Sequence, residues 1–257
     1  MPKTALFDPI SMRRVDFDNR IVVAPMCQYS ADDGMPSDWH VVNVGQYAVS
    51  GVGLIFVEKT AVEPIGRITP GCTGIWNDAQ AESWARVIAF TRTWSSGAKM
   101  GMQLGHAGRK ASVHAPWGGS GPLGADEGAW QTEGPSAIPH APSWHVPLAM
   151  GDNAIERLKT AYRESTLRTH DAGFDVLELH AAHGYLLHQW LSPIANQRDD
   201  QYGGSLENRM RLPLEIFDIC RAVWPEDKPM GVRISATDYA PHSSWNIEEA
   251  VVFAKEL

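Results

Sequence analysis

The chain has 257 residues, 44% hydrophobic and 20% charged, which is enough to bury a large core as one α/β barrel or two smaller domains. Its formal net charge of −8 argues against nucleic acids and anionic membranes as partners, because both are polyanions. The three cysteines form no CxxC pair, the apolar run 52–57 is too short to span a bilayer, and the first ten residues lack a signal-peptide core, so we expect a cytoplasmic protein.

Short apolar runs alternate with amphipathic stretches along the chain. The predicted strands cover 21–26, 52–62, 99–106, 175–182 and 230–235. These runs are continuously apolar, as expected of parallel strands covered on both faces. The predicted helices cover 38–49, 78–94, 152–171 and 205–224, and a last one opens at residue 246.

Several residues mark where the predicted helices end, start or bend. Gly51, Gly97 and Gly173 are expected at the C′ positions of the first three helices. Pro213 should kink the fourth helix or begin a new one. Asn246 opens the last helix, and Glu249 follows three residues later as in a capping box.

The segment 114–150, after the third predicted strand, breaks this rhythm because it is rich in glycine, proline and tryptophan. A loop of this length is either a solvated insertion or a functional lid, and both interpretations stay open.

Strands alternating with helices predict βαβ units with right-handed crossovers. With no linker in the chain, we expect one domain over 1–257, a (β/α)₈ TIM barrel with about five of its eight strand–helix units, truncated at the C-terminus. A five-stranded open sheet is the alternative, although no strand is followed by GxGxxG and no GxxxxGK[ST] exists.

In a barrel, chemistry gathers at the C-terminal ends of the strands. These ends carry two histidines, a tyrosine, a cysteine, an amide and an arginine, but few carboxylates: Cys27, Gln103, His180, His183, Tyr185 and Arg233. This set suits binding of a neutral or anionic oxygen and delivery of a proton, and it does not suit two-carboxylate glycoside hydrolysis.

The same residues allow other interpretations. His180 and His183 could bind a metal with His106 or Glu178, as in a metal-dependent barrel hydrolase, but no third ligand has convincing spacing, so we predict no metal. Cys27 could simply be a small buried hydrophobic residue. Arg233 ends an apolar strand and needs an anionic partner, either Asp175 or Glu178 or a negatively charged cofactor.

Four motifs resemble the Old Yellow Enzyme family of FMN-dependent ene-reductases: APMCQYSADDG (24–34), HAGRKA (106–111), ELHAAHGYL (178–186) and SPIANQRDDQYGGSLENRMR (192–211). The resemblance runs from the first strand to the last residue. It is closest to the branch of YqjM-like enzymes and xenobiotic reductase A, because of Cys27 and Tyr29.

The resemblance implies an FMN-containing (β/α)₈ barrel. Pro25, Met26 and Cys27 would line the flavin ring, with Cys27 at its reactive edge, where it would tune the potential. Ala61 and Gln103 would hydrogen-bond the pyrimidine part of the ring. Arg233 would lie beside N1 and O2, where negative charge collects on reduction.

The resemblance also implies how an activated C=C bond would be reduced. His180 and His183 would hold the carbonyl or nitro oxygen of an enone or related alkene, Tyr185 would supply the proton, and Tyr29 would be a second donor over the substrate. NADPH or NADH would be the reductant, and Arg109 and Lys110 are candidate readers of its 2′-phosphate.

The chain departs from the family pattern in one respect. The family's phosphate site follows strands seven and eight, which we do not find in this chain. An arginine that completes the neighbouring active site in related oligomers is not found either, and we expect a homo-oligomer for the full-length form. A catalytically incompetent fragment therefore remains an alternative function.

Overall fold

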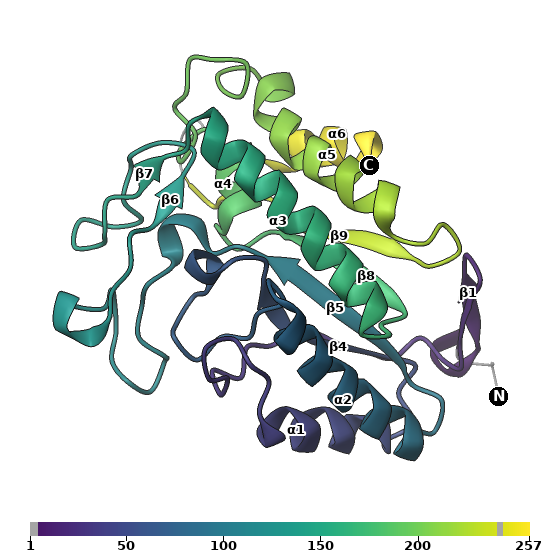
Figure 1. The fold of residues 1–257 in the computed structure, drawn as a ribbon. Helices are drawn as coiled ribbons and strands as arrows, with labels where there is room; N and C mark the ends of the chain where they lie inside the picture. The colour runs from purple at the N-terminus through teal and green to yellow at the C-terminus, as the bar shows by residue number, and fades with distance from the viewer. Residues whose placement is uncertain (1–4, 241–243) are drawn as a thin grey trace.

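The computed structural model describes residues 5–240 and 244–257, so the first four residues of the N-terminal stretch discussed above lie outside it. Five parallel strands form the centre of the molecule (Figure 1). They are β3 (Val22–Val23), β4 (Leu54–Ala61), β5 (Lys99–Gly105), β8 (Val176–Ala181) and β9 (Met230–Ile234).

The order of these strands across the sheet is their order along the chain. A (β/α)₈ barrel is built from such sequential parallel strands, whereas a doubly wound open sheet reverses its order at a switch point. The sheet is therefore a half-barrel, part of a TIM barrel, and the prediction of an incomplete barrel is confirmed. β3 and β9 are its two edges.

The first strand is shorter than predicted, because the pairing of β3 with β4 stops at Val23. Pro25 has no backbone N–H with which to continue a ladder, and the chain from Ala24 onward is irregular. This early exit carries residues 24–30 across the C-terminal end of the sheet instead of along it.

The helices cover one face of the sheet, where α1, α2, α3 and α5 lie side by side (Figure 1). Their bounds are α1 (Asp38–Ala48), α2 (Asp78–Trp94), α3 (Asp152–Asp171), α5 (Leu206–Val223) and α6 (Ile247–Glu256). Each of these helices contacts the next along the chain, as in the outer ring of a barrel. The five predicted helices are confirmed within one or two residues.

The predicted helix signals have mixed outcomes. Gly173 is the C′ residue of α3, where its N–H bonds to His170 O and the next N–H bonds to Thr169 O, the two bonds of a Schellman motif. Gly97 is not a C′ residue, because α2 ends at Trp94 and is followed by an extended residue. Gly51 has a positive φ but lies three residues beyond the end of α1.

Two other helix predictions need correction. α5 continues through Pro213 without a break, so no new helix starts there. The Asn246 side chain does accept from Glu249 N–H at 2.9 Å and caps α6. However, the Glu249 carboxylate turns to Arg209 at 2.6 Å instead of completing a capping box.

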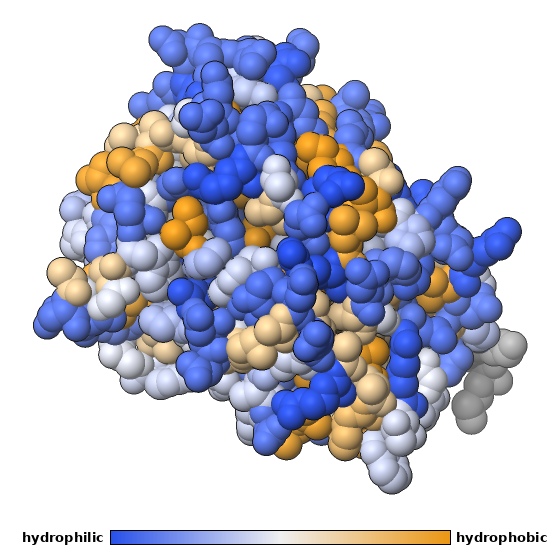
Figure 2. Space-filling model, in the orientation of Figure 1, coloured by the Kyte–Doolittle hydropathy of each residue, from blue (hydrophilic) through white to orange (hydrophobic). Residues whose placement is uncertain are grey.

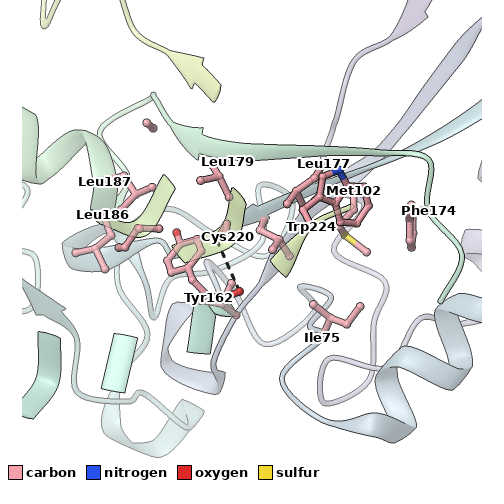
Figure 3. Close-up of a cluster of buried hydrophobic side chains, with 14 of the residues drawn as sticks. Ile75, Met102, Tyr162, Phe174, Leu177, Leu179, Leu186, Leu187, Cys220 and Trp224 are labelled. Carbon is pink, nitrogen blue, oxygen red and sulfur yellow. Dashed lines mark hydrogen bonds between the residues drawn. The ribbon is translucent and has the colours of Figure 1, made fainter. Parts of the chain in front are cut away.

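The main core lies between the sheet and its helices. Figure 3 shows side chains of β5 and β8 meeting Tyr162 of α3 and Cys220 of α5. Trp84, Trp190 and Trp245 are also fully buried. Burial of each large apolar side chain stabilises the fold by roughly 1.5–3 kcal/mol, so this layer holds the strand ends in place.

Several elements were not predicted from the sequence. β1 (Ile10–Met12) and β2 (Val15–Phe17) form a hairpin whose Phe17 packs on Leu54 and Val176, at the start of two barrel strands. α4 (Leu186–Leu191) follows β8, and all six of its residues are buried. A helix that is buried all round lacks the alternation of polar and apolar faces by which helices are recognised.

The segment 114–150 is not a featureless loop. It contains a short parallel pair, β6 (Glu133–Gly134) and β7 (Leu148–Ala149), and the 3₁₀ turn η4 (Ala125–Glu127). β6 contacts α4 and the 3₁₀ turn η3 (Gly108–Lys110), which both follow strand ends. The segment therefore lies at the C-terminal end of the half-barrel. The remaining short turns are η1 (Ala5–Phe7) and η2 (Pro64–Gly66).

The surface is largely polar. On the face shown in Figure 2, hydrophilic residues predominate and apolar residues form separate small patches. Within residues 5–240 and 244–257, no helix combines the length and apolar character that a bilayer crossing requires.

Candidate functional site at the C-terminal strand ends

A buried carboxylate of β4 holds the segment that follows β3 in place. Glu58 of β4 accepts from Gln28 N–H at 3.1 Å through one oxygen, and its other oxygen lies 2.9 Å from His40 Nε2. His40 Nδ1 accepts from Ser37 N–H, which leaves the ring proton on Nε2, facing Glu58. Both side chains are almost completely buried. This pair fixes the backbone between Cys27 and Tyr29.

Three of the predicted site residues come together on one apolar cluster. Cys27, Tyr29 and Tyr185 pack against buried residues of two further segments, which follow β4 and β5: Ile68, Cys72, Ala107, Ala111 and Val113. The chain ends of β3, β4, β5 and β8 therefore meet here, as the barrel prediction requires. Met26 points outward from the same segment and is 56% exposed.

The two histidines after β8 form a directional pair. His180 Nδ1 accepts from Ala182 N–H at 3.2 Å, so its ring proton lies on Nε2. Nε2 in turn faces His183 Nδ1 at 3.1 Å and donates to it. His183 then carries its proton on Nε2 and is exposed, with a left-handed φ of 58°. Such backbone strain at a strand end is typical of a functional site.

Tyr185 completes this group from the N-terminus of α4. Its ring lies edge-on to His180, with the ring centres 5.0 Å apart. Lys110 Nζ lies 5.1 Å from the centre of the same ring and donates to His183 O at 2.9 Å. Burial raises the pKa of the Tyr185 phenol, which therefore keeps its proton at neutral pH.

The surroundings keep the histidines neutral. Burial, and then the repulsion that a protonated His183 would exert, lower the pKa of His180 well below its ordinary value. Burial and the charge of Arg233 lower the pKa of His183 in the same direction. Burial also raises the pKa of Tyr29 to about 12. At neutral pH the site thus offers uncharged N–H and O–H donors.

Further along the inner face, Gln103 is held in one orientation. Its Nε2 donates to Glu178 Oε1 at 2.6 Å, which leaves the amide oxygen as an acceptor. A β-bulge between Phe56 and Lys59 puts Ala61 on this same face. The Ala61 N–H already donates to Thr73 O, and its carbonyl accepts from Ile75 N–H, so only one lone pair of that carbonyl is left for a ligand.

Arg233 ends β9 beside His180, its partner across the strand pair. Within the part of the chain that the structure describes, its half-buried guanidinium has no hydrogen-bond acceptor and no ion pair. Asp175, one of the predicted partners, binds Arg92 and Met100 N–H instead. Glu178 is close enough for the charge of Arg233 to lower its pKa, although burial outweighs this and raises that pKa. Among the described residues the guanidinium therefore has no direct ion pair, and Glu178 acts on it only at longer range.

The segment 114–150 contributes aromatic side chains to the site. Trp117 lies edge-on to Tyr29, with the ring centres 5.6 Å apart. Trp130 and Trp144 pack on the Cys72 cluster, and Trp130 Nε1 donates to Ile65 O. These contacts put the segment beside the predicted catalytic residues.

The metal interpretation finds no support in the geometry. His106 Nδ1 accepts from Gly108 N–H, and its Nε2 lies 3.1 Å from Glu63 Oε1, so this ring turns away from the His180–His183 pair. In residues 5–240 and 244–257, no three His, Cys, Asp or Glu side chains are grouped so that they could hold a metal ion.

Sequence reasoning missed three residues of the site. Glu58 and Lys59 interrupt an otherwise apolar strand, and a charged pair in such a run is a signal of buried electrostatics. Cys72 lies 45 positions after Cys27 (72 − 27) and belongs to no recognisable motif, so only the tertiary structure could bring the two cysteines into one cluster.

Comparison with known proteins agrees with this geometry. Residues 5–257 match the family model described as the NADH:flavin oxidoreductase / NADH oxidase family. The chain is 46% identical to an NADH:flavin oxidoreductase of Gibberella zeae, over 99% of this chain and 64% of that protein. It is 41% identical to an NADPH dehydrogenase of Bacillus cytotoxicus, over 98% of this chain and 68% of that protein.

Solved structures of similar fold superpose closely on this chain. Old Yellow Enzyme from Pichia sp. AKU4542 superposes with a TM-score of 0.84 at 30% identity, covering 98% of this chain and 66% of that one. Morphinone reductase in complex with tetrahydroNAD superposes with a TM-score of 0.81 at 29% identity, covering 97% and 68%. The chain spans about two thirds of the length of these relatives. By sequence, fold and the residues at its strand ends, the chain belongs to the NADH:flavin oxidoreductase family, the family of the Old Yellow Enzymes.

Proposed function

We propose that the protein is an FMN-dependent ene-reductase of the YqjM-like branch, which uses NAD(P)H to reduce C=C bonds activated by a carbonyl or nitro group. The observation that carries this proposal is Arg233, a half-buried cation near a strand end that makes no direct ion pair or side-chain hydrogen bond among the described residues. Leaving such a charge uncompensated costs several kcal/mol, so a bound anion is expected beside it.

The residues at the strand ends fit an FMN ring. Pro25, Met26 and Cys27 would line one side of it, and the exposure of Met26 leaves an apolar surface for a flat ligand. Gln103 Oε1 or the remaining lone pair of the Ala61 carbonyl would accept from the single N–H of the pyrimidine edge, and the second N–H of the Gln103 amide would donate to one of its carbonyls. When bound, the flavin supplies hydride chemistry.

His180 and His183 would hold the substrate oxygen. Because both imidazoles stay neutral, they act as N–H donors and do not protonate the substrate outright. The His180–His183 hydrogen bond would open to let an oxygen accept from His180 Nε2. These donors would draw electron density away from the β-carbon of the alkene.

Tyr185 would deliver the proton to the α-carbon. Its raised pKa keeps Oη protonated until the substrate becomes basic enough to take the proton. Lys110, above the ring, would help to fix its orientation. Tyr29, packed against Trp117, would be a second donor, with segment 114–150 acting as a lid that excludes water.

The reductant would be NADPH or NADH, bound in turn with the alkene in the same pocket. Relatives named NADPH dehydrogenase support NADPH, and the tetrahydroNAD complex of morphinone reductase supports a nicotinamide as an occupant of such a site. We also expect the full-length form to be a homo-oligomer.

A second candidate is a chain that folds but does not retain FMN and is not catalytic. It is favoured by one fact, namely that the chain spans about two thirds of its relatives. Titration with FMN separates the two candidates, because a ligand that binds only the folded state raises the melting temperature.

The decisive experiment combines flavin binding with one substitution. Purified protein should show an oxidised-flavin absorbance band that bleaches with NADPH and returns with cyclohexenone. Arg233→Gln removes a charge-assisted hydrogen bond worth about 1.5–3 kcal/mol, so FMN affinity should fall roughly ten- to hundredfold.

The matched control is Arg14→Gln, an exposed arginine in the β1–β2 turn, which should leave FMN affinity unchanged. A colourless protein that FMN neither binds nor stabilises would exclude the ene-reductase for this chain. Equal affinities of the Arg233 and Arg14 variants would refute the role given to Arg233.

A further inference from the structure

Two cysteines belong to the apolar cluster that also contacts Tyr29 and Tyr185. Cys27 comes from the segment after β3, and Cys72 comes from the loop after η2. The two segments are tied together by Ala31 N–H, which donates to Gly71 O at 2.9 Å. Cys72 is a buried member of this cluster, and the partly buried Cys27 packs against it.

The sulfur of Cys72 lies among hydrogen-bond donors. Thr69 N lies 3.4 Å and Thr69 Oγ1 lies 3.7 Å from it, within a turn closed by Cys72 N–H bonding to Thr69 O. Donors of this kind stabilise a thiolate more than a thiol. A thiolate at Cys72 would therefore be stabilised by groups of its own turn.

A buried lysine adds positive charge to the pair. Lys59 Nζ donates to Gly66 O at 2.7 Å and has no other acceptor among the described residues, and its charge acts on both thiols. Burial lowers the pKa of Lys59, while a neighbouring thiolate opposes that shift. The ammonium and a thiolate therefore stabilise each other.

The balance of these effects differs for the two thiols. Burial alone raises the pKa of Cys72, but the bond from Cys27, the charge of Lys59 and the Thr69 N–H outweigh it and lower that pKa to about 6. The pKa of Cys27 rises, because its proton is held by Cys72 and because it is buried. Cys72 is thus the more acidic of the two thiols, and Cys27 is the one that keeps its proton more firmly.

Cys220 shows that this arrangement is not general to the chain. Its sulfur lies in the core, 3.9 Å from Tyr162 O (Figure 3). Burial raises the pKa of Cys220 to about 12. It is a buried thiol of low reactivity and a natural internal control.

We propose that Cys27 and Cys72 form a peroxide-sensitive dithiol that closes reversibly to a disulfide. The packing of Cys27 on the small cluster that holds Cys72, the backbone bond between their two segments and the donors from Thr69 carry the proposal. Cys27, the partly exposed member, is the sulfur that a hydroperoxide reaches, and Cys72 is the resolving thiol.

The chemistry balances with a hydroperoxide as the oxidant. The Cys72 thiolate takes the proton of Cys27, and the Cys27 sulfur attacks a peroxide oxygen, which breaks the O–O bond and leaves a sulfenic acid and hydroxide. Hydroxide then takes the proton back from Cys72, which attacks the sulfenic sulfur and expels a second hydroxide. Two sulfurs lose two electrons, and the peroxide is reduced to water and hydroxide.

The consequence for the active site rests on the proposed function. In that role Cys27 faces the flavin, so a bond to Cys72 would draw its sulfur away from the ring and remove the thiol hydrogen. Formation of the disulfide itself does not need FMN. It can therefore be tested on the protein with or without flavin.

The test is oxidation with stoichiometric hydrogen peroxide, followed by thiol titration under denaturing conditions and intact mass analysis. The wild-type chain should lose two of its three thiols and about 2 Da in mass, and peptide mapping should join Cys27 to Cys72. A dithiol reductant should restore both thiols.

Variants separate this pair from general oxidation. Cys220→Ser should still lose two thiols, whereas Cys72→Ala should lose no mass and should instead gain oxygen at Cys27. Lys59→Met, with all three cysteines kept, should form the disulfide more slowly than the wild-type chain at pH 7, because the Cys72 thiolate loses a nearby cation. Wild-type protein that keeps all three thiols, that gains oxygen on Cys27 without a link, or that links either cysteine to Cys220 would overturn the proposal.

Discussion

Glu58→Ala is the most informative single perturbation of this fold, because one buried carboxylate joins α1, β4 and the segment that carries Cys27. The substitution would remove the acceptor of His40 Nε2 at 2.9 Å and that of Gln28 N–H at 3.1 Å. The Glu58 and His40 side chains are 1% and 2% exposed, so water cannot replace either bond without a rearrangement.

The expected cost follows from these contacts. Each hydrogen bond to a charged acceptor contributes about 1.5–3 kcal/mol, and breaking a buried pair by removal of one partner costs about 3–5 kcal/mol. We therefore expect Glu58→Ala to lower the free energy of unfolding by about 3–5 kcal/mol. In Glu58→Gln the amide oxygen still accepts from Gln28 N–H, but the amide NH₂ group, itself a donor, faces His40 Nε2–H. This variant should therefore lose about half as much free energy of unfolding as Glu58→Ala.

Urea unfolding followed by tryptophan fluorescence measures this difference at pH 7. The control is Glu82→Ala, an exposed residue of α2 with no side-chain hydrogen bond among the described contacts, which should change stability by less than about 0.5 kcal/mol. A loss below about 1 kcal/mol for Glu58→Ala, or an equal loss for Glu58→Gln, would refute the argument that two buried bonds depend on this carboxylate.

Three further predictions concern catalysis, acid stability and close packing. Tyr185→Phe should slow alkene reduction at least about a hundredfold and spare flavin reduction by NADPH, as stopped-flow absorbance of the two half-reactions would reveal, and equal losses in both would contradict a proton-donor role. Burial raises the pKa of Asp238, but hydrogen bonds from His188, Ser192 and Trp245 N–H outweigh burial and lower that pKa. The ionised Asp238 carboxylate therefore stabilises the fold at pH values above its ordinary pKa of about 4. This stabilisation is lost as the pH falls through the lower pKa of the folded state. Asp238→Asn should thus be less stable than wild type at pH 7 by about 1–2 kcal/mol, with the difference shrinking below pH of about 4 in urea titrations, and a constant difference would be evidence against linkage. Gly53→Ala should destabilise the fold by at least about 1–3 kcal/mol, because its Cβ would lie 2.3 Å from the backbone oxygen of Asn19, whereas Gly231→Ala meets nothing within 4 Å and should be neutral in the same melting assay.

Local sequence signals predicted the scaffold well, because the signals depend on residues close together in the chain. Continuous apolar runs predicted the five strands, and caps such as Asn246 and Gly173 predicted helix ends within a residue or two. The strand ends then identified His180, Tyr185 and Arg233 as candidate site residues, since parallel strands of a barrel present their ends on one side.

Other features were invisible because tertiary contacts outweigh local preference. Buried α4 has no polar face, so periodicity does not reveal it. Glu249 was expected to complete a capping box, but Arg209 of another helix offers a charged partner at 2.6 Å, which is worth more than a second capping bond.

The sequence by itself determined the class of fold, because apolar runs alternate with amphipathic stretches along the chain, and it showed which polar residues follow each strand. Only the tertiary structure decided which groups come together: that Glu58 supports the Cys27 segment, that Gln103 is oriented by Glu178, and that Cys72 and Cys27 share one cluster. These contacts join residues far apart in the chain. Burial strengthens each hydrogen bond and charge interaction, because the dielectric constant of the protein interior is low. No local sequence pattern predicts which of these groups are buried together, because that depends on how the strands pack side by side.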